Sequence, residues 1–115
     1  MQRKRTKNTR GPTPLEREFQ GWLKLRPCVV TGRGPVEVHH CKGSTFRHNK
    51  TLIGHAFCIP LFRDMHLEYH AGTKAWIENY GTQSAYWEKV HDDWFSETGN
   101  RMPDDVIEAI RDYSR

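Results

Sequence analysis

Apolar side chains recur every three or four residues along much of the chain, which is the period of a helix that buries one face. This period predicts five helices, over residues 13–26, 63–71, 73–80, 83–95 and 103–113. The first begins with a capping box, in which Thr13 is the N-cap, Pro14 takes the first helical position and Glu16 follows three residues after the cap. Pro27 is expected to end this helix, and Asp64 is the expected N-cap of the second.

Two short runs rich in β-branched residues, at 28–31 and 36–39, are separated by the turn-forming stretch Gly32-Arg33-Gly34-Pro35. This arrangement predicts a β-hairpin. Residues 41–54 are polar and irregular and are expected to form a surface loop, and the apolar run 57–61 is expected to pack beneath it. One hairpin with several helices predicts an α+β fold, in which residues 13–115 form a single domain.

Residues 1–12 are almost devoid of apolar side chains and are expected to form a flexible basic arm. The formal net charge is +4, and five of the first ten residues are basic, whereas residues 78–115 carry nine acidic and four basic side chains. Positive charge therefore concentrates in the first two thirds of the chain. Such a distribution favours a polyanionic partner.

The composition also limits where the protein acts. No apolar run reaches the roughly 18 residues that cross a bilayer, and no apolar segment follows the basic start as in a secretory signal, so we expect a cytoplasmic protein that does not bind membranes. The cysteines Cys28, Cys41 and Cys58 are odd in number and lack CxxC spacing. They are expected to be buried reduced thiols rather than disulfides or a zinc ribbon.

Six of the seven histidines lie between His39 and His70. His66 and His70 are four residues apart on a predicted helix, so both side chains project from one face and could bind one metal ion. The intervening residues form neither HExxH nor HxxEH, which disfavours a zinc peptidase. An isolated HxxxH pair is more often structural. The histidine pair His39-His40 that precedes it in the sequence favours a metal site here.

Three segments in order, PCVVTGRGPVEVHH, IPLFRDMHLEYHAG and KAWIENYGTQ, resemble the HNH or ββα-metal endonucleases, most closely the phage recombination-enhancement type. The resemblance implies a small ββα-metal core over residues 27–72, flanked by additional helices that include the C-terminal helices of residues 73–115. It makes His39, His66 and His70 ligands of one divalent ion and His40 the general base. His55 then takes the central position of the motif, where it would orient the base or brace the loop.

Adjacent strand residues point to opposite faces, so a regular strand could not aim both His39 and His40 at one ion. We therefore expect the strand to end or bulge near His39. Imidazole ligands do not identify the metal, which could be Mg²⁺, Mn²⁺, Zn²⁺ or Ni²⁺. Nine basic side chains are the expected phosphate contacts: Arg3, Lys4, Arg5, Lys7, Arg10, Lys42, Arg47, Lys50 and Arg63.

These residues together predict a metal-dependent endonuclease that hydrolyses phosphodiester bonds of single- or double-stranded DNA. The resemblance further implies a role in phage recombination, with a RecA-like recombinase filament as a partner and the bacterial host cytoplasm as the location. The alternative is a non-catalytic nucleic-acid-binding module with a structural, histidine-bound zinc. Sequence specificity, nicking against double-strand cutting and the oligomeric state stay open.

Overall fold

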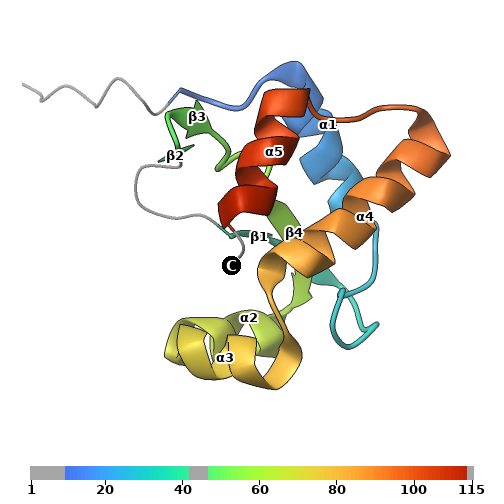
Figure 1. Ribbon diagram of the computed structural model, residues 1–115. Helices are drawn as coiled ribbons and strands as arrows, with labels where there is room; N and C mark the ends of the chain where they lie inside the picture. The colour runs from blue at the N-terminus through green and yellow to red at the C-terminus, as the bar shows by residue number, and fades with distance from the viewer. Residues whose placement is uncertain (1–9, 42–46, 114–115) are drawn as a thin grey trace, which may run out of the picture.

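A computed structural model describes residues 10–41 and 47–113 of the chain. The fold is mixed α+β (Figure 1), as expected from the sequence. Its elements in chain order are α1 (Pro14–Leu23), β1 (Val36–His40), β2 (Arg47–His48), β3 (Thr51–Leu52), β4 (Cys58–Phe62), α2 (Arg63–Ala71), α3 (Thr73–Tyr80), α4 (Gln83–Thr98) and α5 (Asp104–Tyr113).

The central sheet is an antiparallel pair of β1 and β4, in which His39 lies opposite Ile59 and His40 opposite Cys58. Helices α1, α4 and α5 lie on one side of this pair in Figure 1, and α2 and α3 lie on the other. A second, two-residue pairing joins β2 to β3 beside α5. Among the described residues no helix has the length and apolar content needed to span a bilayer.

The predicted hairpin of residues 28–31 with 36–39 is wrong. Residues 29–31 form a turn instead, which the amide of Gly32 closes by donating to the Cys28 carbonyl at 2.8 Å. The strand that pairs with β1 is formed by the apolar segment that we expected only to pack beneath the loop of residues 41–54. Every residue of Cys58–Leu61 is buried, so this segment shows a continuous apolar run rather than the alternation that identifies a half-exposed strand.

The helices follow the apolar pattern closely. The capping box of α1 is confirmed, because the Thr13 hydroxyl accepts from the Glu16 amide at 3.1 Å and the Glu16 carboxylate accepts from the Thr13 amide at 2.8 Å. Helix α1 ends three residues earlier than predicted, and α4 continues to Thr98 before Gly99 adopts a left-handed conformation with φ of 78°. Asp64 is not the N-cap of α2, since β4 runs directly into the helix and Phe62 occupies that position.

The core contains buried residues of the sheet and of all five helices, most of them between the sheet and helices α1, α4 and α5. Trp76, Trp87 and Trp94 are fully buried, and the Trp87 indole N–H donates to the carbonyl of Ala56 at 2.8 Å. All three cysteines are buried and free, which confirms the sequence expectation. The core thereby joins α4 to the loop that precedes β4.

His91 is a buried histidine of this core and makes stability depend on pH. Its Nε2 accepts a hydrogen bond from the Met102 amide at 3.0 Å, and its ring stacks on Trp87 with centroids 4.5 Å apart. Burial lowers the pKa of His91 from 6.5, and the nearby Arg101 acts in the same direction while Asp92 opposes it. Below pH 6.5 the unfolded chain therefore takes up a proton at this site that the folded protein resists.

We expect the free energy of unfolding to fall as the pH is lowered from 7 to 5, because the depressed pKa stabilises the unfolded state under acid. In His91→Gln this decrease should be smaller, although the variant loses ring stacking and is less stable at pH 7. Urea unfolding followed by tryptophan fluorescence at pH 7, 6 and 5 measures both. Identical pH slopes for the two proteins would show that His91 does not contribute.

Candidate metal centre

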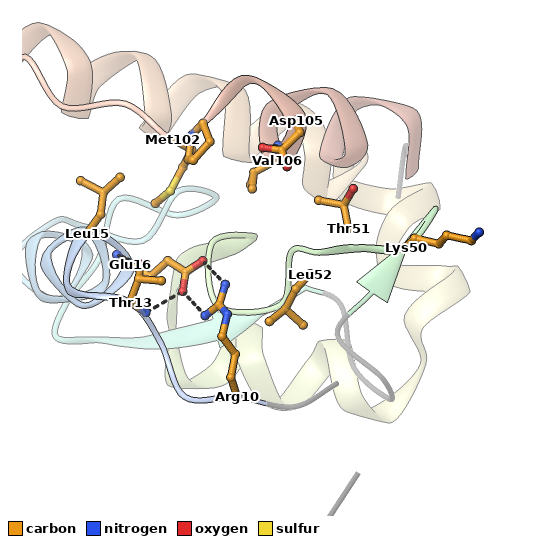
Figure 2. Close-up of a pocket in the computed structure, with 11 residues that line it drawn as sticks. Arg10, Thr13, Leu15, Glu16, Lys50, Thr51, Leu52, Met102, Asp105 and Val106 are labelled. Atoms are coloured by element: carbon orange, nitrogen blue, oxygen red, sulfur yellow. Dashed lines mark hydrogen bonds and ion pairs between the residues drawn. The ribbon is translucent and has the colours of Figure 1, made fainter. Parts of the chain in front are cut away.

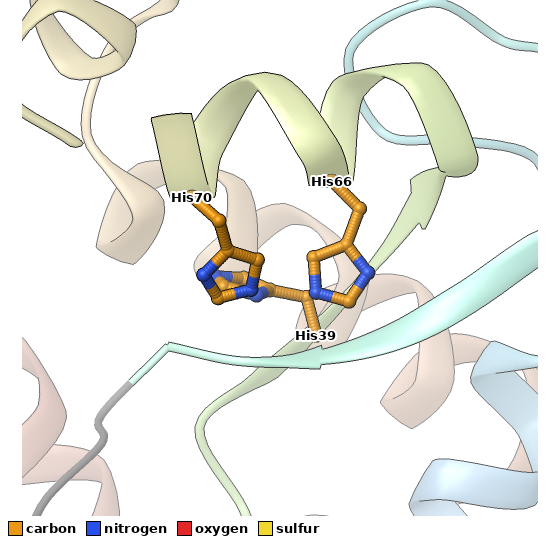
Figure 3. Close-up of side chains that lie close together, drawn as sticks. All are labelled: His39, His66 and His70. Carbon is orange, nitrogen blue, oxygen red and sulfur yellow. The ribbon is translucent and has the colours of Figure 1, made fainter. Parts of the chain in front are cut away.

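Three histidines from β1 and α2 gather on one side of the sheet (Figure 3). Helix α2 begins directly where β4 ends and packs against both strands, so its inner face covers β1. His66 and His70 are one helical turn apart on that face, above His39. One ring nitrogen from each of the three lies within 4.8 Å of the others, a spacing at which all three could bind one ion.

The solvent exposure of the three histidines increases from His39 through His66 to His70. His39 is 1% exposed, His66 is partly buried and His70 is exposed. The ring centroid of His39 lies 4.9 Å from that of His66 and 4.4 Å from that of Tyr69, which restricts the rotation of the buried ring. A ligand would therefore approach from the His70 side.

Two hydrogen bonds determine which ring nitrogens are available. Nδ1 of His66 lies 2.8 Å from a carboxylate oxygen of Glu37, and Nε2 of His39 lies 2.7 Å from the amide oxygen of Gln83. A carboxylate accepts, so His66 donates through Nδ1 and keeps Nε2 for a ligand. Nδ1 of His39 is buried and has no hydrogen-bond partner among the described residues.

The buried ring of the cluster favours the neutral state. The pKa of His39 is lowered to about 4, chiefly by burial and to a smaller extent by the neighbouring His66 and His70, while the hydrogen bond to Gln83 acts in the opposite direction. A neutral imidazole is the form that binds metal ions. At neutral pH His39 is therefore a neutral imidazole, the form that can bind a cation.

His40 lies on the opposite side of β1 from His39. We expected the strand to end or bulge near His39, and it ends one residue later, with its register unbroken through His40. The pleat therefore leaves His40 exposed, with its ring centroid 6.1 Å from that of His55. Partial burial lowers the pKa of His40, and the nearby His55 and His66 act in the same direction.

His55 joins the loop before β4 to the start of the described chain. Its Nε2 donates to the carbonyl of Arg10 at 2.7 Å, and its own carbonyl accepts from the Gln20 amide group at 2.7 Å. These two hydrogen bonds tie the loop to residue 10 and to α1, and the ring of His55 also lies beside that of His40.

Of the expected arm over residues 1–12, residues 1–9 lie outside the described part of the chain, whereas Arg10 is described and has a partner. Its guanidinium pairs with the buried Glu16 carboxylate at 2.9 Å (Figure 2). Burial alone would raise the pKa of Glu16, but the hydrogen bonds from Arg10 and the Thr13 amide outweigh it and lower the pKa. The chain is therefore held from residue 10 onward, and this arginine already has an anionic partner.

The remaining basic candidates divide into two groups. Arg63 lies beside the histidine cluster, where its guanidinium contacts Glu37 at 3.3 Å, the carboxylate that also binds His66. Arg47 and Lys50 lie on the β2–β3 hairpin beside α5, away from α2 (Figure 1), and Arg47 donates to the Lys50 carbonyl at 2.8 Å. The others, Arg3, Lys4, Arg5, Lys7 and Lys42, lie outside the described residues.

A separate pocket lies between the start of α1, β3 and the start of α5 (Figure 2). Arg10, Glu16, Lys50 and Asp105 line it together with apolar side chains. None of the clustered histidines reaches it, so the candidate chemistry does not take place there. His48, on β2, bonds to Asp112 of α5 at 2.8 Å.

Sequence reasoning missed the two residues that orient the cluster, Glu37 and Gln83. The position of Glu37 could have been predicted from the sequence, because residues two apart on a strand share a face and Glu37 precedes His39 by two. Gln83 lies 44 residues from His39 at the first position of α4, and no local pattern connects them.

The chain belongs to the family described as "Protein of unknown function (DUF968)", which matches residues 4–99. Over 69 residues it is 30% identical to the "Uncharacterized protein YdfU" of Escherichia coli strain K12. This alignment covers 60% of the chain and 20% of YdfU, so the chain spans about a fifth of that relative. No solved structure matches the chain significantly.

Proposed function

We propose that this member of the DUF968 family is a metal-dependent DNA endonuclease of the HNH type, in which His39, His66 and His70 hold one divalent cation. The observation that carries the proposal is the convergence of three imidazole nitrogens within 4.8 Å, although the residues are up to 31 positions apart. They project from a strand and a helix that pack together, so their separation is set by packed backbone rather than by loops.

The donor set fits a divalent ion. Three nitrogen ligands from the protein are the pattern of catalytic zinc sites, which keep further positions for water or substrate. The exposed His70 edge supplies the opening that such a position requires. The hydrogen bond from His66 to Glu37 supplies the outer partner that metal-bound histidines usually have. Imidazoles suit Zn²⁺, Ni²⁺ and Mn²⁺ at least as well as Mg²⁺.

The proposed reaction is attack of water on the phosphorus of a phosphodiester, which forms a new P–O bond and breaks the bond to the leaving 3′ oxygen. A bound divalent ion supplies charge stabilisation on the phosphate and the leaving oxygen. His40 is the proposed acceptor of the proton of the attacking water. Its ring lies across β1 from His39 and beside that of His55, so the water would have to lie beyond the end of the strand, where both the His40 ring and the cation reach it. Solvent protonates the leaving oxygen.

Arg63 is the proposed phosphate contact at this centre. Its side chain is 70% exposed, and its partner Glu37 is also bonded to His66, so the guanidinium lies next to a metal ligand. An incoming phosphate would compete with Glu37 for the same donors. DNA is the proposed substrate because the net charge is +4 and the basic residues precede and include the histidine region.

Incubation of supercoiled plasmid with the protein tests the proposal. With Mn²⁺, Mg²⁺, Zn²⁺ or Ni²⁺ we expect open-circular or linear product, and EDTA should abolish it because the cluster then lacks its cation. The same assay on DNA coated with a RecA-like recombinase tests whether a filament is required. Absence of cleavage on both substrates with every ion would contradict the proposal, and unfolding by EDTA in that case would favour the structural-zinc module.

A further inference from the structure

Gln83 contacts the histidine cluster from outside the strand and helix that carry the ligands. It is the first residue of α4, is 1% exposed, and places its amide oxygen 2.7 Å from Nε2 of His39. The start of this helix is capped by the Thr82 hydroxyl, which accepts from the Ala85 amide, and the helix is tied to the loop before β4 by the Trp87 indole, which donates to the Ala56 carbonyl. The amide of Gln83 therefore approaches His39 from a fixed direction.

This contact selects one form of the His39 ring. An amide oxygen has lone pairs and no proton, so the hydrogen of this bond belongs to Nε2 of His39. In the neutral ring Nδ1 must then carry the lone pair. Nδ1 is buried, and no described residue donates a hydrogen bond to it. A buried acceptor without a donor is unfavourable unless another partner reaches it. The ring centroids of His66 and His70 lie 4.9 and 5.8 Å from that of His39, so a cation held among the three rings would be such a partner.

We propose that Gln83 is the positioning residue of the metal centre, holding His39 as the Nε2–H tautomer so that Nδ1 binds the divalent cation. The inference rests on the proposed function, because it needs the metal centre, and it extends that centre beyond β1, β4 and α2 to α4. Glu37 has the matching role at His66 but selects the opposite tautomer. The cation then meets Nδ1 of one histidine and Nε2 of the other.

A purely structural hydrogen bond between two buried side chains would also stabilise the fold, so stability alone does not test the inference. The positioning role makes two further demands. The tautomer of His39 must be set before any metal arrives, and metal affinity must depend on an acceptor at position 83.

The tautomer is measurable in the metal-free wild-type protein by long-range ¹H–¹⁵N correlation NMR of the imidazole rings. We expect the Nε2–H pattern for His39 and the Nδ1–H pattern for His66, which serves as the internal comparison. An Nδ1–H pattern for His39 would overturn the inference. This measurement needs no variant, so it stays decisive if a substitution of buried Gln83 prevents folding.

Metal affinity is measured by isothermal titration of Zn²⁺ into the wild-type protein, Gln83→Met and Gln83→Glu. Methionine matches the length of glutamine but accepts no strong hydrogen bond. The Zn²⁺ affinity of Gln83→Met should therefore be about 10- to 100-fold weaker than that of wild type, the usual effect of removing a residue that hydrogen-bonds to a metal ligand. Glutamate has only acceptor oxygens and should bind Zn²⁺ at least as tightly as wild type. Gln20→Met removes a glutamine that contacts the His55 carbonyl, and its affinity should be unchanged.

The results separate this inference from the proposed function. If wild type binds Zn²⁺ and Gln83→Met binds it within twofold, Gln83 does not position the centre, whereas the endonuclease proposal stands. If Gln83→Glu is as weak as Gln83→Met, the amide does not act as an acceptor and the inference is overturned. If wild type binds none of Zn²⁺, Mn²⁺ or Ni²⁺, the metal centre itself is wrong and the proposed function falls with it.

Discussion

His70→Ala is expected to weaken divalent-metal binding strongly and to lower DNA cleavage with it while the protein stays folded. His70 is the exposed member of the cluster, and its ring contacts within the described chain are with the neighbouring rings of the cluster and Tyr69. Its removal should therefore cost little stability. Losing one of three ligands should weaken Zn²⁺ binding by more than the ~10- to 100-fold that follows loss of an outer partner.

The control is His48→Ala. His48 is also a partly exposed histidine, but it bonds to Asp112 beside α5 and lies away from the cluster. Calorimetric titration and plasmid cleavage should be unchanged in this variant. If His70→Ala binds Zn²⁺ as tightly as wild type, His70 is not a ligand, and the proposed three-histidine metal centre is wrong.

His40→Ala is expected to lower cleavage by about 10²- to 10⁴-fold, the usual contribution of a positioned general base, without changing Zn²⁺ affinity. The reason is the pleat of β1, which directs His39 toward α2 and leaves His40 on the other side beside His55. Removal of a metal ligand would lower metal affinity, whereas removal of a general base lowers only the rate of the chemical step. Single-turnover cleavage at saturating metal, together with calorimetry, distinguishes the two.

Thermal unfolding of metal-free His40→Ala should match that of wild type closely, since the side chain is exposed. If this variant cuts plasmid as fast as wild type, another group deprotonates the water. If it instead loses metal affinity, His40 is a ligand rather than a base, and the assignment of roles along β1 must be revised.

Helix α2 shows what local pattern predicts well. Its bounds and the shared face of His66 and His70 were expected from the sequence, because both depend on the helical period and on the glycine that follows Ala71. The capping box of α1 was likewise readable from four consecutive residues. Only the N-cap of α2 was wrong, since no side chain caps a helix that continues directly from a strand.

The β-partner of β1 shows where local pattern fails. Residues 28–31 have the composition of a strand and lie near β1 in sequence, yet β1 pairs with Cys58–Phe62 across an intervening loop. Composition alone could not separate these two candidates, because strand pairing is decided by burial on both faces of the sheet. The buried run of β4 satisfies that requirement and the turn at residues 29–31 does not.

From its sequence alone this protein is specified as five amphipathic helices around a small sheet, with a helix that carries two histidines on one face and a strand that ends in two more. Those features depend on interactions between residues close in the chain. The distance between His39 and the helix, the separate directions of His39 and His40, and the contact from Gln83 were decided only by the tertiary structure. Each depends on how segments distant in the sequence pack against one another. In a histidine ring, the nitrogen that is available to a metal ion is the one that does not donate a hydrogen bond, and the fold decides which acceptor lies beside the other nitrogen.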